Sequence, residues 1–158
     1  MRIGTVLLIG VALLLLVSCA TISRINIELP EGFAEKRTRP VLVSSSYMAV
    51  SPEGMLFEVR SVKNYPPQGL DFWQEALETH LKREGYLPKG KEVRFDTSRE
   101  EGILFEWTMP YGSRNYTYLT AIIPVKKRIL VCEVAGESSI YTEYREEILK
   151  SLRSISFR

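Results

Sequence analysis

An apolar segment near the start, Val6 to Val17, restricts the fold of this chain more than any other feature. Its twelve residues are interrupted only by Gly10, and they are fewer than the roughly 20 that a helix needs to span a bilayer. Polar residues resume at Thr21, so the segment cannot be extended. With Arg2 in front of it, the segment has the length and flanks of a secretory signal peptide. We therefore expect the fold to be built from the residues that follow.

The end of this segment, Leu16-Val17-Ser18-Cys19, resembles the lipobox of bacterial lipoproteins, in which an apolar residue and small residues precede a cysteine. The resemblance implies cleavage between Ser18 and Cys19 and attachment of a diacylglyceryl group to the Cys19 thiol. Several acyl chains give stable anchoring, because each buried CH2 group contributes about 0.8 kcal/mol. The alternative is an ordinary secretory peptide, or a short uncleaved anchor, with a chance cysteine.

The lipobox implies a domain organisation and a location. Residues 1–18 are expected to be the signal peptide, residues 19–24 a lipidated tether, and residues 25–158 a single domain. Ala20 follows the cysteine, whereas an aspartate there would resemble an inner-membrane retention signal. We therefore expect a lipid-anchored protein of the bacterial cell envelope, on the outer membrane facing the periplasm if the source is Gram-negative.

The composition fits one globular domain and argues against some functions. Hydrophobic residues make up 45% and charged residues 25%, as in ordinary soluble domains. A net charge of +2 is too small to indicate nucleic-acid binding. Two cysteines and one histidine leave little room for a zinc site, which takes about four such ligands, so we expect no metal or other cofactor. Cys132 lies among apolar neighbours and is expected to be a buried, inert thiol.

Strand patterns and tight turns dominate the chain after the tether. Residues 25–33 begin with the alternation of a strand, and residues 34–40 read as a charged loop. Residues 41–50 and 54–62 predict a hairpin. A second set of strands, joined by turns that carry glycine or proline, predicts an antiparallel meander; it comprises residues 103–109, 116–123 and 128–135.

Two helices complete the pattern. Residues 70–85 repeat apolar side chains at helical spacing, and Asp71 is placed to cap the first turn. Ser138 or Ser139 is placed to cap a final helix, which keeps helical spacing to Ile155. Because the strands follow one another without regular strand–helix–strand alternation, we expect an α+β fold with one antiparallel sheet and helices packed on it.

Several stretches of this domain resemble the PsbP-like family, which includes DcrB-like bacterial lipoproteins. They are the opening strand and Pro-Gly turn "INIELPEGF", the first helix from Trp73 to Tyr86, and the closing stretch "YTYLTAIIPVKKRILVCEVAG" with its following helix. The resemblance implies an α/β/α sandwich and a non-catalytic accessory or binding role. It carries over no binding residue, because no partner or metal site of the family has a recognisable match here.

Three carboxylates in the predicted strands are the weak candidates for chemistry: Glu58, Glu106 and Glu133. Two of them could approach across the sheet and act as an acid/base pair or bind a hard cation. The alternative is that they lie on the solvated face or pair with Arg60. His80 is the only histidine and falls at or near the apolar side of its helix, so a structural role is favoured over a catalytic base. Together with the lack of catalytic sequence motifs, these patterns predict no enzyme.

A cluster around one predicted turn is the candidate binding site: Arg114, Tyr116 and Tyr118. Tyrosine and arginine are common at protein interfaces, although turn solubility and cross-strand aromatic pairing explain the same pattern. Lys126, Lys127 and the following arginine occupy the turn at the other end of the same strand.

The sequence therefore predicts a membrane-anchored envelope lipoprotein that binds or supports another envelope protein or assembly, and not nucleic acid. Two alternatives remain. One is a small-ligand or lipid-binding module with an apolar cavity between helix and sheet, beside Trp73 and Trp107. The other is a hydrolase that uses the strand carboxylates. Convergence of those carboxylates in one cleft would favour the hydrolase.

Overall fold

The computed structural model describes residues 25–36 and 46–157. The signal peptide, the Ser18–Cys19 cleavage site and the tether predicted above lie outside these residues, as do residues 41–45 of the predicted hairpin. The elements, in chain order, are β1 (Ile25–Asn26), β2 (Ala34–Glu35), β3 (Ser46–Val50), β4 (Leu56–Lys63), α2 (Leu70–Arg83), β5 (Leu87–Pro88), β6 (Val93–Asp96), β7 (Glu101–Tyr111), β8 (Arg114–Val125), β9 (Arg128–Glu137), α3 (Ser138–Ser154) and β10 (Ser156–Phe157).

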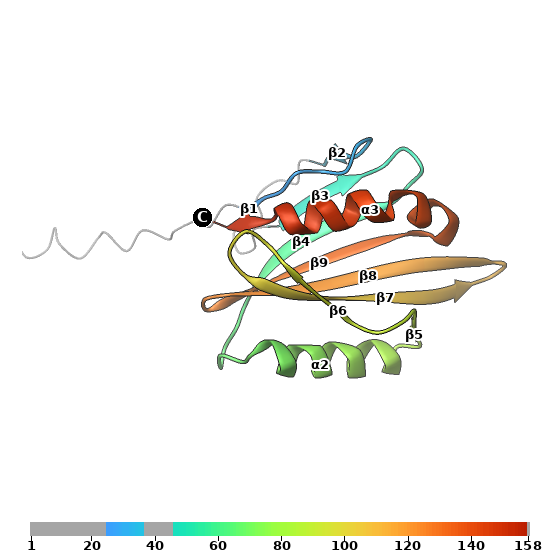
Figure 1. The fold of residues 1–158 in the computed structure, drawn as a ribbon. Helices are drawn as coiled ribbons and strands as arrows, with labels where there is room; N and C mark the ends of the chain where they lie inside the picture. Colours follow the sequence, from blue (N-terminus) through green and yellow to red (C-terminus); the bar gives the residue numbers. More distant parts are fainter. Residues whose placement is uncertain (1–24, 37–45, 158) are drawn as a thin grey trace, which may run out of the picture.

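One antiparallel sheet of eight strands forms the middle of the molecule. Its order is β2-β3-β4-β9-β8-β7-β5, and β6 also pairs with β7. The α2 and α3 helices lie on opposite sides of this sheet (Figure 1). The expected α+β class, the β3–β4 hairpin pairing and the β7–β8–β9 meander are confirmed.

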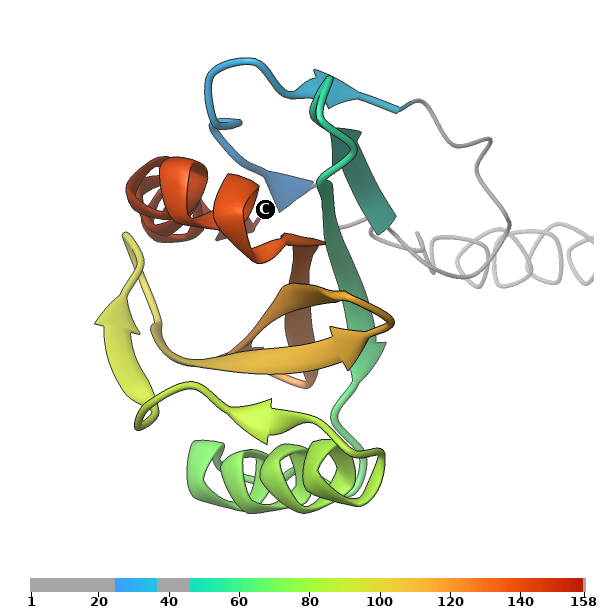
Figure 2. The same cartoon turned by 90° about the vertical axis from the view of Figure 1, so that its right-hand side faces the viewer.

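The larger hydrophobic core lies between the sheet and α3. Side chains from one face of the central strands, such as Phe57 and Leu119, pack there with Tyr141, Ile148 and Leu152 of the helix, and all five are fully buried. Figure 2 shows the sheet curving around α3, with the segment from β1 to β2 lying over the same side. Burial of this apolar surface is the main force that holds α3 in place.

A second, smaller core lies between the sheet and α2. Phe105, Trp107 and Ile122 contribute from β7 and β8, and Leu81 is the buried residue of the helix. Trp73 packs against this core and donates its indole N–H to Asn64 Oδ1 over 3.2 Å. Since the strands alternate their side chains, one sheet supplies both cores.

The prediction of one strand from Ile25 to the turn at Pro30 was wrong. Only Ile25 and Asn26 form a strand, and they pair with β10 rather than with the large sheet. Beyond them, the apolar side chains Ile27, Leu29 and Phe33 pack individually against the α3 core. Alternation therefore identified the inward-facing residues but not their backbone pairing. Residues 34–35, predicted as loop, form β2 on the edge of the large sheet.

The predicted caps of both helices were also wrong. Ser138 is the first residue of α3, whose N-cap is Glu137 without a side-chain hydrogen bond. The α2 helix begins at Leu70, its N-cap is Gly69, and no side chain caps it. Asp71 instead accepts a hydrogen bond of 2.7 Å from Arg94 of β6. At the other end, Gly85 adopts φ +88°, and Tyr86 N–H donates to Leu81 O, which closes the helix as a glycine terminus.

We expect Gly102→Ala to destabilise the fold by about 1–3 kcal/mol. A Cβ atom at this position would lie 2.7 Å from the Phe95 ring and 3.0 Å from Ile123. Urea unfolding measures the loss, and the loss should shrink in a Phe95→Ala background, where the ring is absent. Equal stability of Gly102→Ala and the wild type would contradict this packing.

Candidate functional site

The α2 helix covers only part of its side of the sheet. It packs against β7 and β8, and the core beneath it also includes Val62 of β4 and Ile129 and Val131 of β9. Among the described elements, none covers the rest of that side of β3, β4 and β9. Strand register assigns the following residues to this uncovered surface, which we call the open face: Met48, Val50, Leu56, Glu58, Arg60, Glu133 and Ala135. None of these seven residues is fully buried.

Rows of paired residues cross from the open face to the core beneath α2. One row runs Met48–Glu58–Glu133–Thr120–Phe105, and the neighbouring row runs Val50–Leu56–Ala135–Tyr118–Trp107. Each row begins among exposed or half-buried side chains and ends at a buried aromatic ring. The open face is therefore a continuation of the core surface that neither of the two described helices covers.

Arg60, Glu133 and Tyr118 form a hydrogen-bonded network at the inner border of the open face. The Arg60 guanidinium donates to both oxygens of Glu133, over 3.0 and 3.1 Å. The Tyr118 hydroxyl donates to the same carboxylate, and Tyr86 packs against the Tyr118 ring at 5.2 Å between centroids. A bidentate pair of this kind has defined geometry as well as charge.

The network keeps Glu133 ionised. Burial alone would raise the pKa of the Glu133 carboxyl, but the hydrogen bonds from Arg60 and Tyr118 and the charge of Arg60 outweigh it, so the pKa lies below its ordinary value. Burial and the bond to Glu133 raise the pKa of the Tyr118 hydroxyl. A carboxylate held in this way is a poor proton donor at neutral pH, because a general acid needs a raised pKa.

The three candidate carboxylates do not converge. Glu58 and Glu133 are directly paired across β4 and β9, but Glu106 lies on the opposite face of the sheet. There it accepts hydrogen bonds of 2.8 Å from Tyr141 Oη and Arg145 Nε, which join β7 to α3. The predicted pairing of a strand carboxylate with Arg60 is found at Glu133.

Apolar side chains border the charged network. Val50 and Leu56 are 38% and 36% exposed, and Met48 is half-buried. Exposed apolar groups beside a half-buried arginine and a tyrosine resemble the composition of protein-binding surfaces. Sequence reasoning missed Met48, Val50 and Leu56, because alternation could not show that α2 packs over other strands and leaves these residues uncovered.

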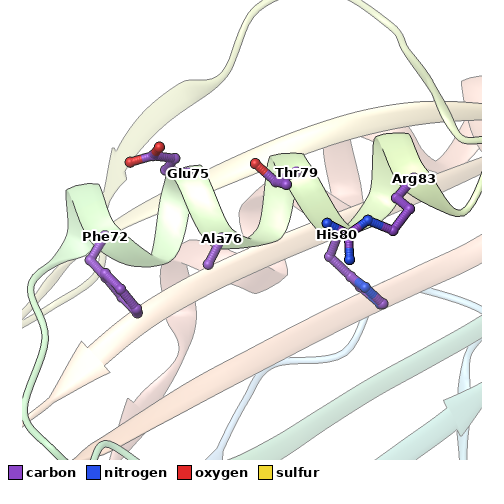
Figure 3. Close-up of a pocket in the computed structure, with 6 residues that line it drawn as sticks. All are labelled: Phe72, Glu75, Ala76, Thr79, His80 and Arg83. Atoms are coloured by element: carbon purple, nitrogen blue, oxygen red, sulfur yellow. The ribbon is translucent and has the colours of Figure 1, made fainter.

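A shallow groove of about 350 Å³ runs along α2. Its lining residues are Phe72, Glu75, Ala76, Thr79, His80 and Arg83. Figure 3 shows Phe72, Ala76 and His80 pointing toward the side of the helix on which β9 and β4 lie. His80 is exposed and not on the packed side of the helix, and this groove adds an aromatic and a cationic side chain beside the open face.

The predicted binding cluster is divided between two environments. Arg114 and Tyr116 lie near the β7–β8 turn, where Arg114 pairs with Glu137 over 3.3 Å and Tyr116 contacts Tyr111 edge-on. Tyr118 belongs instead to the network with Arg60. All three lie on the same side of β8 by alternation, so the cluster forms one edge of the open face.

The described residues offer few groups for a metal ion or a covalent reaction. Within residues 25–36 and 46–157, no three His, Cys, Asp or Glu side chains gather as a metal site would require. Cys132 is fully buried, and burial raises the pKa of its thiol, as expected for an inert cysteine. No helix among these residues is long and apolar enough to span a bilayer.

Comparison with known proteins identifies the fold. Neither a protein-family model nor a curated protein matches this chain. Among solved structures, LpqN of Mycobacterium tuberculosis, a protein involved in cell envelope biogenesis, matches with a TM-score of 0.64 and 8% identity, over 85% of this chain and 83% of LpqN.

Two further structures agree. The cyanobacterial PsbP of Synechocystis matches with a TM-score of 0.57 and 8% identity, over 90% of this chain and 99% of that one. A protein of unknown function from Pseudomonas aeruginosa matches with a TM-score of 0.60 and 8% identity, over 80% and 97% of the two chains. The chain therefore has the PsbP-like α+β fold, as the sequence resemblance implied. At this identity the likeness concerns the fold alone.

We expect Glu133→Gln to destabilise the protein by about 1 kcal/mol at pH 7, because Arg60 loses its charged partner at a partly exposed site. Glu58→Gln is the matched control, since Glu58 is paired with Glu133 across the strands and should change stability by less than about 0.5 kcal/mol. Urea unfolding of both variants measures the difference, and equal losses would contradict the network.

The same network has a pH dependence of known sign. Because the pKa of Glu133 is lower in the folded chain than in the unfolded one, its contribution is fully present above the unfolded pKa of about 4.3. The contribution is lost as the pH falls through the folded pKa. The stability difference between wild type and Glu133→Gln should therefore shrink as the pH is lowered below about 4.

Proposed function

We propose that this protein is a lipid-anchored component of the bacterial cell envelope, and that its open face binds another envelope protein. The observation that carries the proposal is the uncovered half of the sheet. There, the exposed side chains of Val50 and Leu56 border the ordered network of Arg60, Glu133 and Tyr118. The role is accessory, with no reaction of its own.

The physical case for a protein partner rests on the kind of groups presented. A half-buried arginine fixed by a bidentate carboxylate has already lost much of its rotamer freedom, so its side chain loses less conformational entropy on binding. The Arg60 side chain is still 40% exposed and that of Glu133 is 22% exposed, so both can reach a partner. Apolar area around such a polar centre supplies the burial that stabilises a complex.

The lipobox and the fold support the envelope location independently. Cys19 and the residues before it have the spacing of a lipoprotein cleavage site. LpqN, which shares the fold, is a protein of cell envelope biogenesis. Diacylation of Cys19 would hold the domain at a membrane surface without a spanning helix.

A hydrolase is less well supported by the geometry. Glu106 lies on the opposite face from Glu58 and Glu133, and the ionised Glu133 is held in an ion pair with Arg60. The ligand-carrier alternative required a cavity beside Trp73 and Trp107. Trp107 is only 1% exposed and stacks on Phe105, and neither tryptophan lines the groove on α2.

The anchor is tested by Cys19→Ala. Mass spectrometry of the wild-type protein from its native membrane should find a chain that begins at Cys19 and carries acyl chains. The variant should lack them and leave the membrane fraction. Cys132→Ala is the matched control and should keep both the lipid and the location. Acyl labelling that persists in Cys19→Ala would contradict the anchor.

The binding surface is tested by photo-crosslinking in the native envelope. A photoreactive residue at Leu56 should give one defined protein adduct, and the same residue at the exposed Glu143 of α3 should not. Val50→Lys, which places a charge on the open face, should abolish the Leu56 adduct. Adducts of equal yield from both positions, or adducts with lipid alone, would contradict the proposed surface.

A further inference from the structure

One end of the molecule gathers the start of the described chain and an exposed group of lysines. The β1–β10 pair brings Ile25 beside the end of α3. Figure 1 shows this pair at the same end as the turn between β8 and β9. Lys126 and Lys127 form that turn, and Asn64 N–H, in the loop after β4, donates to Lys127 O over 2.9 Å.

The loop after β4 adds a cation and an aromatic side chain to this end. Lys63, the last residue of β4, is paired with Arg128 and exposed. Tyr65 is 87% exposed. Tyrosine is enriched where proteins meet the headgroup layer of a membrane. We call Lys63, Tyr65, Lys126 and Lys127 the basal group.

The charges of the basal group are available to a partner. Within the described residues, none of the three lysines forms an ion pair. The acidic residues Asp71 and Glu101 are both paired with Arg94, and Asp96, opposite Glu101 in the β6–β7 pair, is exposed. The chain as a whole is almost balanced, with 21 basic and 19 acidic residues, so an electrostatic contact at this end depends on the local lysines and not on the net charge.

Lys126 occupies a backbone conformation that a lysine rarely adopts. Its φ is +54° in a two-residue turn, where glycine is the residue that fits without strain. A side chain other than glycine at a strained position is a candidate for a functional role. Lys126 is exposed at this turn, which Figure 1 shows at one end of the sheet.

The length of the tether limits how far the basal group can lie from the membrane. Only five residues separate Cys19 from Ile25, so a fully extended tether reaches about 20 Å. Because Ile25 is fixed at the basal end by β10, a membrane holding Cys19 lies close to that end. Lipid phosphates are then the anions nearest to the lysines.

We propose that the basal group binds the anionic phospholipid headgroups of the membrane in which the protein is anchored, and so orients the domain with its basal end on the bilayer. This inference rests on the proposed lipidation of Cys19. Each lysine close to an anionic surface adds to the attraction, which falls off within a Debye length.

Hydrogen–deuterium exchange of the acylated full chain in nanodiscs tests the proposal. Peptides covering residues 61–69 and 124–129 should take up deuterium at least about twofold more slowly with phosphatidylglycerol present than with phosphatidylcholine alone. Peptides at the β7–β8 turn, residues 110–116, should not change. The difference should disappear in about 1 M NaCl, at which the Debye length is about 3 Å.

A pair of matched variants separates this effect from general charge. Lys126→Gln/Lys127→Gln should abolish the slower exchange, whereas Lys89→Gln/Lys91→Gln, which removes two exposed lysines from the turn after β5, should keep it. Equal exchange in both lipids for acylated wild-type protein would overturn the basal contact and leave the anchor standing. An unacylated Cys19 in the native protein would overturn both.

Lys126→Gly should change two measured properties in opposite directions: thermal stability should rise and protection by anionic lipid should fall. Glycine removes the strain of the positive φ, so the melting temperature should rise by about 2–5 °C. The protection by phosphatidylglycerol should weaken, because one lysine is lost. If Lys126→Gly kept the full slowing of deuterium uptake by phosphatidylglycerol, the role of Lys126 in lipid binding would be overturned.

Discussion

The alternation of side chains along four central strands is the constraint from which the rest of this molecule follows. On one side, β4, β9, β8 and β7 supply a core that α3 and the segment after β1 cover. On the other side, α2 packs against β7 and β8. A helix of 14 residues has one apolar stripe and covers about two strands, since helices are about 10 Å wide and strands lie about 4.8 Å apart. Beyond Val62, Ile129 and Val131, which reach the core under α2, no element within residues 25–36 and 46–157 covers that side of β3, β4 and β9.

The chain places an ordered charge network at the boundary between covered and uncovered surface. Breaking one member of a partly buried pair is costly, because the remaining charge is left with less compensation. Arg60 and Glu133 therefore stabilise this edge of the core while remaining within reach of a second molecule. Glu106 makes the equivalent contact on the other side, where Tyr141 and Arg145 attach α3 to β7. Structural roles of this kind account for two of the three strand carboxylates.

Periodicity predicted the fold class, both helices and the β7–β8–β9 meander, because these segments repeat strongly and end in recognisable turns. It could not predict the face on which each carboxylate lies, which depends on register, nor the pairing of Ile25 with the end of the chain. Asp71 has the composition of a cap but pairs with Arg94, a contact across 23 residues that no local pattern contains. Tyr118 was grouped with Arg114 and Tyr116 around one turn, but its hydrogen-bond partner, Glu133, lies on the neighbouring strand.

Hydroxyl-radical footprinting tests the central claim, that the open face meets another envelope protein, most directly. Met48 and Tyr116 are half-buried residues of this side of the sheet and its edge, and both side chains react readily with radicals. The account predicts that they are oxidised in the purified protein and protected in intact envelopes, while Tyr144, half-buried on α3 at the other side of the sheet, reacts in both. Equal oxidation of Met48 and Tyr116 in the purified and native states would contradict it.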